Sequence, residues 1–208
     1  MRVEQALAAL RKGQPIVLYD SENREGEADL IFHASAITPQ QIAYLRQNAG
    51  GSIVLAIGKE VAKELQLPFL HDLFKAAGIP NTYVRTNYND TPPYTIPINH
   101  VDAHTGVTDN DKALAICEFS ALLSQRNARR RFLQLFRAPG HLPICVSKGI
   151  ENRRGHTELA CALAHRAGMP ECMVLCEMLG VGRALSKTQA QAFARRNQLI
   201  FLEGREIQ

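Results

Sequence analysis

The stretch PIVLYDSENREGEADLIF, residues 15–32, places an acidic segment between two short apolar runs. Pro15–Tyr19 and Leu30–Phe32 are rich in branched and aromatic residues, which favours a β-strand for each run. Between them, residues 20–29 hold five acidic side chains and one arginine. We therefore expect two strands joined by a loop whose carboxylates repel one another unless a cation compensates them.

Helix-type and strand-type segments alternate on both sides of this pair. Gly13 and Gly168 follow two helical segments, and Thr38 and Ser186 precede two others, as residues that end and begin helices usually do. The alternation favours an α/β fold, more fully an α+β sandwich in which helices flank a mixed β-sheet, with residues 1–208 as a single domain. The expected helices are 3–12, 39–49, 59–65, 110–124, 155–167 and 187–196, and the further strands are 52–57, 94–99, 142–147, 172–178 and 199–202.

One stretch, residues 78–93, interrupts the alternation. It is rich in Pro, Asn, Gly and Thr, which predicts a long loop. Long loops inside compact domains are often functional lids, and we expect such a role here.

The composition fits a soluble globular protein. Of the 208 residues, 46% are apolar and 21% are charged, and the net charge of +4 is too mild to imply nucleic acid as a partner. The apolar runs are too short to cross a bilayer, and the charged start MRVEQALAALRKG is unlike a signal peptide. We therefore expect a cytoplasmic protein that does not bind membranes. The five cysteines lack the C-x-x-C spacing of a zinc site, so we expect buried free thiols without disulfides.

The acidic segment has the composition of half a metal site. A hard divalent cation such as Mg²⁺ prefers oxygen ligands and would offset the carboxylates that Arg24 leaves unbalanced. Gly26 and Ala28 leave room for close approach of the backbone. The alternative is an ordinary polar turn on the surface.

A second polar segment, ENRRGHTE at 151–158, leads directly into an expected helix. The free N–H groups at a helix start bind anions, and Arg153, Arg154 and Thr157 add donors that suit a phosphate. His156 can offer a neutral imidazole nitrogen to a metal. The alternative for this histidine is a structural or merely exposed side chain.

Two more positions are candidates for proton transfer. His141 lies in RAPGH, residues 137–141, expected to be a turn, and its side chain type titrates near neutral pH. Glu177 stands at the C-terminal end of an apolar strand, where α/β folds often place ligand sites. An ordinary turn histidine and a capping or salt-bridged glutamate are the alternatives.

The segment HTGVTDND, residues 104–111, is another polar turn before a helix. Thr105 and Thr108 can donate to a substrate oxygen or phosphate. Equally, Thr108 and Asp109 can serve only to cap the helix. The residues alone leave both interpretations open.

Taken together and in order, these segments resemble 3,4-dihydroxy-2-butanone 4-phosphate synthase of riboflavin biosynthesis. The resemblance runs from about residue 3 to residue 207 and covers nearly the whole chain. One short motif would be weak, but six in register are specific. The matching pieces are REGEADLI (24–31), the helix and Gly-Gly at 41–51, HTGVTDNDKA (104–113), RAPGH (137–141), RRGHTE (153–158) and VLCEM (174–178).

The resemblance implies conversion of D-ribulose 5-phosphate to 3,4-dihydroxy-2-butanone 4-phosphate and formate, with Mg²⁺ or Mn²⁺ and two ions in each active site. It also implies a homodimer with active sites near the subunit interface. Some members carry a GTP cyclohydrolase II domain behind this one. Because this chain ends at Gln208, we expect that second activity to be absent.

Residue roles are carried over by motif. Glu25 and His156 match the metal ligands, and His141 and Glu177 match the positions regarded as essential for catalysis. Asp29 and Glu177 are the candidates for moving protons to and from the sugar, and His141 for assisting departure of a hydroxyl or a later proton transfer. The positions expected to contact substrate are Arg24, Glu25, Asp29, Thr105, Arg153, Arg154, Gly155, His156, Thr157 and Glu177.

The sequence departs from the commoner family pattern in three places. The acidic loop has EGEAD at 25–29 where ENEGD is frequent, which keeps every carboxylate. Val54 stands where many members have Cys, which excludes a thiol role there. The loop at 78–93 resembles only part of the family, which puts its role as a lid in doubt.

Two rival functions remain possible at this point. A different metal-dependent sugar-phosphate isomerase or lyase would use the same acidic loop and phosphate cradle, and formate release separates the two. A nucleic-acid-binding protein would use the basic run RNARRR at 126–131. That run is expected instead to form a solvated helix end, because there is no Trp, few aromatic residues and no known recognition motif.

Overall fold

Six strands form one mixed sheet in the part of the chain that the structure, a computed structural model, describes: residues 2–79, 85–86 and 90–207. The order is β6–β3–β7–β2–β1–β8, with antiparallel pairing in the centre and parallel pairs, β3–β6 and β1–β8, at the edges. The expected mixed sheet is therefore confirmed. The strands are β1 (Ile16–Tyr19), β2 (Ala28–His33), β3 (Gly50–Ile57), β6 (Ile144–Val146), β7 (Cys172–Met178) and β8 (Ile200–Glu203).

Helices cover both faces of this sheet, because its strands carry apolar residues on both sides. α1 and α7 pack on one face, while α2, α5 and α8 bury their apolar residues against the other. Among the described residues, no helix is long and apolar enough to span a membrane. The helices are α1 (Arg2–Arg11), α2 (Pro39–Asn48), α3 (Lys59–Leu65), α4 (Leu70–Ala76), α5 (Asp109–Leu122), α6 (Ala128–Leu135), α7 (His156–Arg166) and α8 (Lys187–Arg196), with short 3₁₀ turns at Ala34–Ala36 and Gly204–Ile207.

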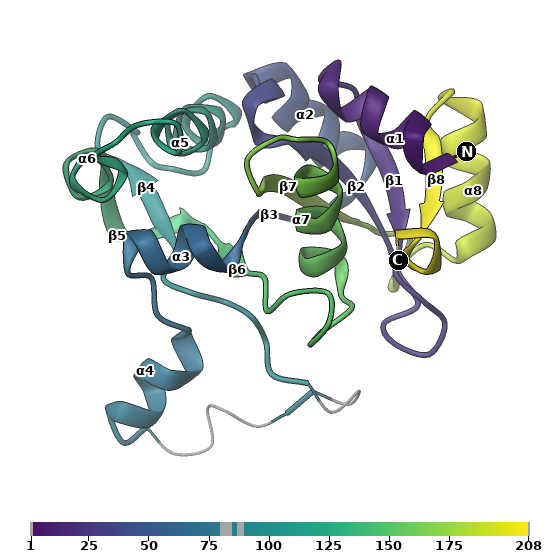
Figure 1. Ribbon diagram of the computed structural model, residues 1–208. Coiled ribbons are helices and arrows are strands. Elements are labelled where there is room, and N and C mark those ends of the chain that lie inside the picture. The colour runs from purple at the N-terminus through teal and green to yellow at the C-terminus, as the bar shows by residue number, and fades with distance from the viewer. Residues whose placement is uncertain (1, 80–84, 87–89, 208) are drawn as a thin grey trace.

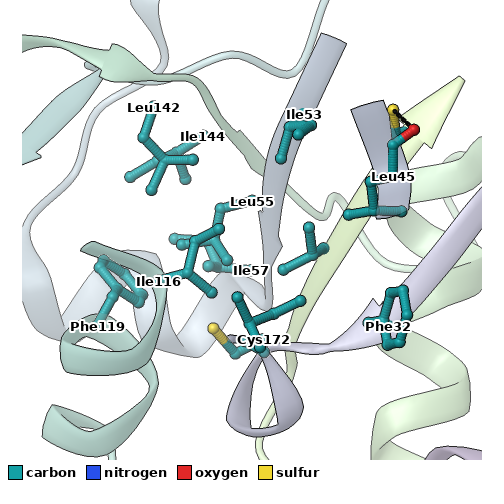
Figure 2. Close-up of a cluster of buried hydrophobic side chains, with 14 of the residues drawn as sticks. Phe32, Leu45, Ile53, Leu55, Ile57, Ile116, Phe119, Leu142, Ile144 and Cys172 are labelled. Atoms are coloured by element: carbon teal, nitrogen blue, oxygen red, sulfur yellow. Dashed lines mark hydrogen bonds between the residues drawn. The ribbon is translucent and has the colours of Figure 1, made fainter. Parts of the chain in front are cut away.

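The larger apolar cluster joins α5 to the sheet. Ile116 and Phe119 of α5 lie with Leu55 and Ile57 of β3 in the same buried cluster (Figure 2). Each of the four side chains is fully buried, which contributes about 1.5–3 kcal/mol per side chain. This packing fixes the position of α5 and of the polar loop that precedes it.

A second, two-stranded sheet lies beside α5 and α6. β4 (Ile98–His100) pairs with β5 (Phe136–Leu142), on the opposite side of the molecule from β8 and α8 (Figure 1). Ile98 pairs with Leu142 while Asn99 pairs with Arg137, so residues 138–141 bulge out of the register. The expected turn at 137–141 is therefore wrong: these residues belong to an irregular strand.

Three elements were not predicted: α4, α6 and β5. α4 buries no residue, so it has no apolar face packed on the core. α6 is only eight residues long and buries only Ala128 and Phe132. The basic run at 126–131 was expected at a helix end, where cations suit the dipole. It leads into the start of α6 instead, and that expectation is wrong. Its arginines are nevertheless solvated.

The remaining differences lie around the expected loop. Residues 90–93 have no regular structure, whereas residues 80–84 and 87–89 of that loop lie outside the described residues. The strand expected at 94–99 is reduced to one bridge between Tyr94 and Cys145, with regular pairing only from Ile98. Pro97 lacks the N–H group that a continuous ladder needs.

Candidate active site

The acidic loop between β1 and β2 is shaped by its first carboxylate. The Asp20 side chain is buried and accepts the backbone N–H groups of Glu25 and Glu27, each at 3.1 Å. The Arg24 guanidinium lies 3.3 Å from the same carboxylate. Asp20 therefore folds the loop over its own side chain, which directs the later carboxylates to the start of β2.

His156, the first residue of α7, meets this loop from the other side of the sequence. Its Nδ1 lies 3.3 Å from Glu25 Oε2, and its Nε2 lies 3.2 Å from the Glu27 carbonyl oxygen. Asp20, Glu25 and His156 each offer a ligand atom within 4.8 Å of the other two. The two predicted metal ligands are thus close enough to bind one ion.

Asp29 supplies a further carboxylate at the centre of the site. It is buried, and its Oδ1 finds no hydrogen-bond donor among residues 2–79, 85–86 and 90–207; the nearest cation is His156 Nε2 at 3.8 Å. Burial raises the pKa of Asp29 to about 7, a rise that His156 opposes and Glu177 reinforces.

The neighbouring carboxylates also change the pKa of His156. Burial lowers the pKa of His156, but the attraction of Asp29, Glu25 and Asp20 outweighs it and raises the pKa to about 9. The donor set of carboxylates and one imidazole, with an unsatisfied buried oxygen beside it, fits a divalent cation.

Glu177 lies directly across the strand pair from Asp29. The β2–β7 register makes the two residues partners, so their side chains project from the same face of the sheet. On the other side of β7 lies β3, where a Cβ at Gly51 would lie 2.5 Å from Glu177 Oε2. The absence of a side chain at Gly51 therefore leaves the space in which the Glu177 carboxylate lies.

A basic rim faces these carboxylates. Arg153 is half-buried and pairs with Glu158 and Asp90, while Arg24 lies 3.4 Å from Asp90 and Lys148 lies 3.6 Å from it. The start of α7 adds free backbone N–H groups to the rim. The rim has the chemistry of an anion site.

A cavity of about 400 Å³ unites these groups. Its polar wall consists of Glu25, Glu27, Asp29, Arg153, His156, Thr157 and Glu177. Val54, Tyr94, Cys145 and Leu175 form much of the apolar wall. Burial raises the pKa of Cys145 to about 12, so this thiol stays neutral and is a poor nucleophile.

Five predicted site residues do not line this cavity: Arg24, Thr105, His141, Arg154 and Gly155. Arg24 and Gly155 lie close beside it, since Arg24 pairs with Glu25 and Gly155 immediately precedes His156. Arg154 is exposed at the start of α7, whereas Thr105 and His141 lie with β4, β5 and the start of α5. Both Thr105 and His141 are exposed. Thr105 and His141 belong to a separate group of residues around β4, β5 and the start of α5. This group is called the β4–β5 cluster below and comprises Asn99, Thr105, Asp111, Lys112 and His141.

The loop that carries Thr105 is held by one carboxylate. Asp111 accepts the N–H groups of His104 at 3.1 Å, Thr105 at 3.0 Å and Gly106 at 2.9 Å. Thr108 caps α5 by accepting the Asp111 N–H, which confirms the capping interpretation for that residue. Asp109 is not the cap; it forms an ion pair with Arg46 at 2.9 Å.

Replacing Asp111 by asparagine is expected to lower the melting temperature by about 3–6 °C at pH 7. The hydrogen bonds from Thr105, Gly106 and His104 hold the pKa of Asp111 well below its usual 3.8. A depressed carboxylate pKa stabilises the fold above the unfolded value, so the difference between wild type and variant is constant above about pH 5 and shrinks below 3.8. Thermal unfolding between pH 7 and pH 3 measures the difference in melting temperature between wild type and variant.

The control is Asp102→Asn, at an exposed carboxylate of the same loop. A difference for Asp111→Asn that does not change with pH would contradict the prediction.

Comparisons with known proteins agree with one another. The family model of 3,4-dihydroxy-2-butanone 4-phosphate synthase matches residues 4–208. The chain is 36% identical over 219 residues to the 3,4-dihydroxy-2-butanone 4-phosphate synthase of Methanosarcina mazei, covering 99% of this chain and 89% of the relative. A solved structure of such a synthase in complex with two magnesium ions superposes with a TM-score of 0.79 at 26% identity, covering 99% of this chain and 94% of the other. The two-domain synthase RibBX of A. baumannii gives a TM-score of 0.82 at 26% identity, with 100% of this chain matched to 56% of that one.

Proposed function

This chain belongs to the 3,4-dihydroxy-2-butanone 4-phosphate synthase family, and from that premise we propose how its own residues divide the work of the reaction. The protein converts D-ribulose 5-phosphate to 3,4-dihydroxy-2-butanone 4-phosphate and formate, a step of riboflavin biosynthesis. The observation that carries the proposal is the 3.3 Å contact between Glu25 and His156, beside a basic rim and the cross-strand pair of Asp29 and Glu177. Residues 1–208 form one catalytic domain in this proposal.

Glu25 and His156 hold the metal, Mg²⁺ or Mn²⁺, with two ions in each site. Carboxylate and imidazole donors suit these ions, and the structural relative described above contains two magnesium ions. When bound, the metal supplies Lewis-acid activation of the substrate's oxygens. Asp20 keeps Glu25 in place through the loop backbone.

The substrate's phosphate binds at the basic rim. Arg153 and Thr157 line the cavity around the start of α7, and Gly155 lies between them, where a Cβ would lie 2.3 Å from Arg153 Nη1. Arg24 and Arg154 add positive charge from the two sides of the rim. Binding energy at this remote group orients the reacting carbons between the carboxylates.

Asp29 and Glu177 move protons to and from the sugar. They are cross-strand partners at one end of the cavity, so both can approach the same substrate carbons and hydroxyls. The raised pKa of Asp29 suits a group that accepts and returns a proton near neutral pH.

The site is completed by a second copy of the chain. Thr105 and His141 are exposed in the β4–β5 cluster and do not line the cavity, so a homodimer in which this cluster faces the partner's cavity brings the two sets together. Val101 and Val107, which are 39% and 57% exposed, flank Thr105 and give the surface apolar area to bury. In a two-fold dimer each active site then uses His141 from one subunit and Glu177 from the other.

Complementation between two inactive variants tests the shared site. His141→Gln and Glu177→Gln, co-expressed with different tags, are expected to regain about one quarter of wild-type formate release, because half of the dimers are mixed and each mixed dimer has one intact site. Formate release from ribulose 5-phosphate, with and without Mg²⁺, is the measurement. Purified mixed dimers that remain as inactive as the parent variants would show that one subunit supplies both residues.

A further inference from the structure

Asn99 is the residue around which the β4–β5 cluster is organised. It is buried in β4, with 7% exposure, and lies beside the irregular segment of β5. Its Oδ1 accepts the backbone N–H of His141 at 2.8 Å, and its Nδ2 lies 3.1 Å from His141 Nδ1. The same Nδ2 lies 3.5 Å from the Thr105 carbonyl oxygen. One amide therefore contacts both Thr105 and His141, the two candidate residues of the β4–β5 cluster.

The hydrogen bonds determine which way this amide points. A backbone N–H can only donate, so the atom of Asn99 that faces the His141 N–H is the oxygen. The NH₂ group then faces His141 Nδ1 and the Thr105 carbonyl oxygen. An amide NH₂ can only donate, so Nδ1 of a neutral His141 must accept, and the ring proton is on Nε2.

The surroundings leave Asn99 little freedom to turn. Gly106 passes so close that a Cβ there would lie 2.2 Å from Asn99 Oδ1, and its φ of +84° is one that residues with a side chain rarely adopt. Lys112 Nζ donates to the His141 carbonyl oxygen at 2.8 Å, which holds the backbone of His141 from the side of α5. Both the amide and the histidine backbone are thus fixed.

We propose that Asn99 is a positioning residue that holds His141 in the tautomer with its proton on Nε2. The ring then presents an N–H donor at its free edge, since Nε2 has no hydrogen-bond partner among the described residues and the side chain is exposed. In the neutral ring this edge polarises a substrate oxygen and does not remove a proton. The catalytic consequence rests on the proposed function, in which His141 reaches the partner's cavity. The assignment of the tautomer does not depend on the proposed function.

The test exchanges the amide for a carboxylate of the same shape. In Asn99→Asp the two oxygens both accept, so Nδ1 of His141 is expected to carry a proton. Long-range ¹H–¹⁵N correlation spectra of ¹⁵N-histidine-labelled protein at pH 8.5 report which ring nitrogen is protonated, and His141→Gln identifies the signal. Wild type is expected to show a protonated Nε2 and an unprotonated Nδ1.

The proposal is overturned if wild type carries its proton on Nδ1, or if Nδ1 of Asn99→Asp stays unprotonated. In kinetics, Asn99→Asp is expected to lower kcat about 100-fold with little change in KM, and to have no further effect in the His141→Gln background. An unchanged kcat would overturn the positioning role. Asn197→Asp, at an amide that donates to the Phe193 carbonyl oxygen at the end of α8, is the control and should keep full activity.

These outcomes separate the inference from the proposed function. If His141→Gln retains full activity, the catalytic role proposed for this histidine fails, while the tautomer seen by NMR still stands or falls by itself. Thermal unfolding of each variant establishes that the proteins compared are folded.

Discussion

Glu25→Gln is expected to lower formate release by about 10³-fold or more, and to weaken Mg²⁺ and Mn²⁺ binding by at least about 100-fold. The substitution keeps the shape of the side chain but removes a negative charge that lies 3.0 Å from Arg24 and 3.3 Å from His156. A neutral amide is a poor ligand for a hard cation in place of a carboxylate. Calorimetric titration of the metal and a formate assay measure the two effects.

The matched control is Glu22→Gln in the same loop. The Glu22 side chain is 76% exposed and lies 3.5 Å from Lys187, so its loss removes one negative charge from the loop without touching the cavity. We expect wild-type metal binding and turnover from that variant. Near-normal formate release from Glu25→Gln would show that this carboxylate does not hold the metal.

Glu177→Gln is expected to lower kcat by about 10²–10⁴-fold, the range for loss of a general acid or base, while metal binding and KM stay near their wild-type values. The amide occupies the space opposite Gly51 as the carboxylate does, so the strand pairing is preserved. What is lost is the group that exchanges protons beside Asp29. Steady-state kinetics together with the metal titration separate this variant from Glu25→Gln.

Glu171→Gln provides the control at the other end of β7. Glu171 lies 3.2 Å from the exposed His165, away from the cavity, and its replacement should leave kcat unchanged. If Glu177→Gln turns over at the wild-type rate, Glu177 carries no essential proton transfer.

Much of the sheet could be predicted because its strands are short and strongly apolar, and because recognisable residues mark where they begin and end. The bounds of β7, α3 and α8 agree with the expected ranges 172–178, 59–65 and 187–196, since glycine, Ser186 or a change of hydropathy marks each end. α4 and α6 lack such marks and are stabilised by little buried surface of their own. β5 was missed because its sequence, FRAPGHL, contains a proline and a glycine that are typical of turns.

Part of the candidate site could also be predicted, since local sequence reveals the chemistry of a segment. The acidic loop and the start of α7 contact each other as expected. Composition could not reveal that the Asp20 carboxylate would accept hydrogen bonds from backbone N–H groups of its own loop. Nor could it reveal that Asp90 would lie between Arg24 and Arg153. Nor could it place His141 in a separate cluster, because that separation follows from the bulge opposite Asn99 and not from any motif.

The arrangement of β1 has a consequence for the order in which the molecule can be built. β1 pairs with β2, its immediate successor in the chain, and on its other side with β8, near the C-terminal end of the described residues. During synthesis on a ribosome the first strand therefore emerges early, but one of its edges stays open until the last strand has been made. Val17 and Leu18, two of the most apolar side chains in that strand, are fully buried in the finished protein, so the nascent chain has to keep this edge from pairing with other chains until β8 arrives.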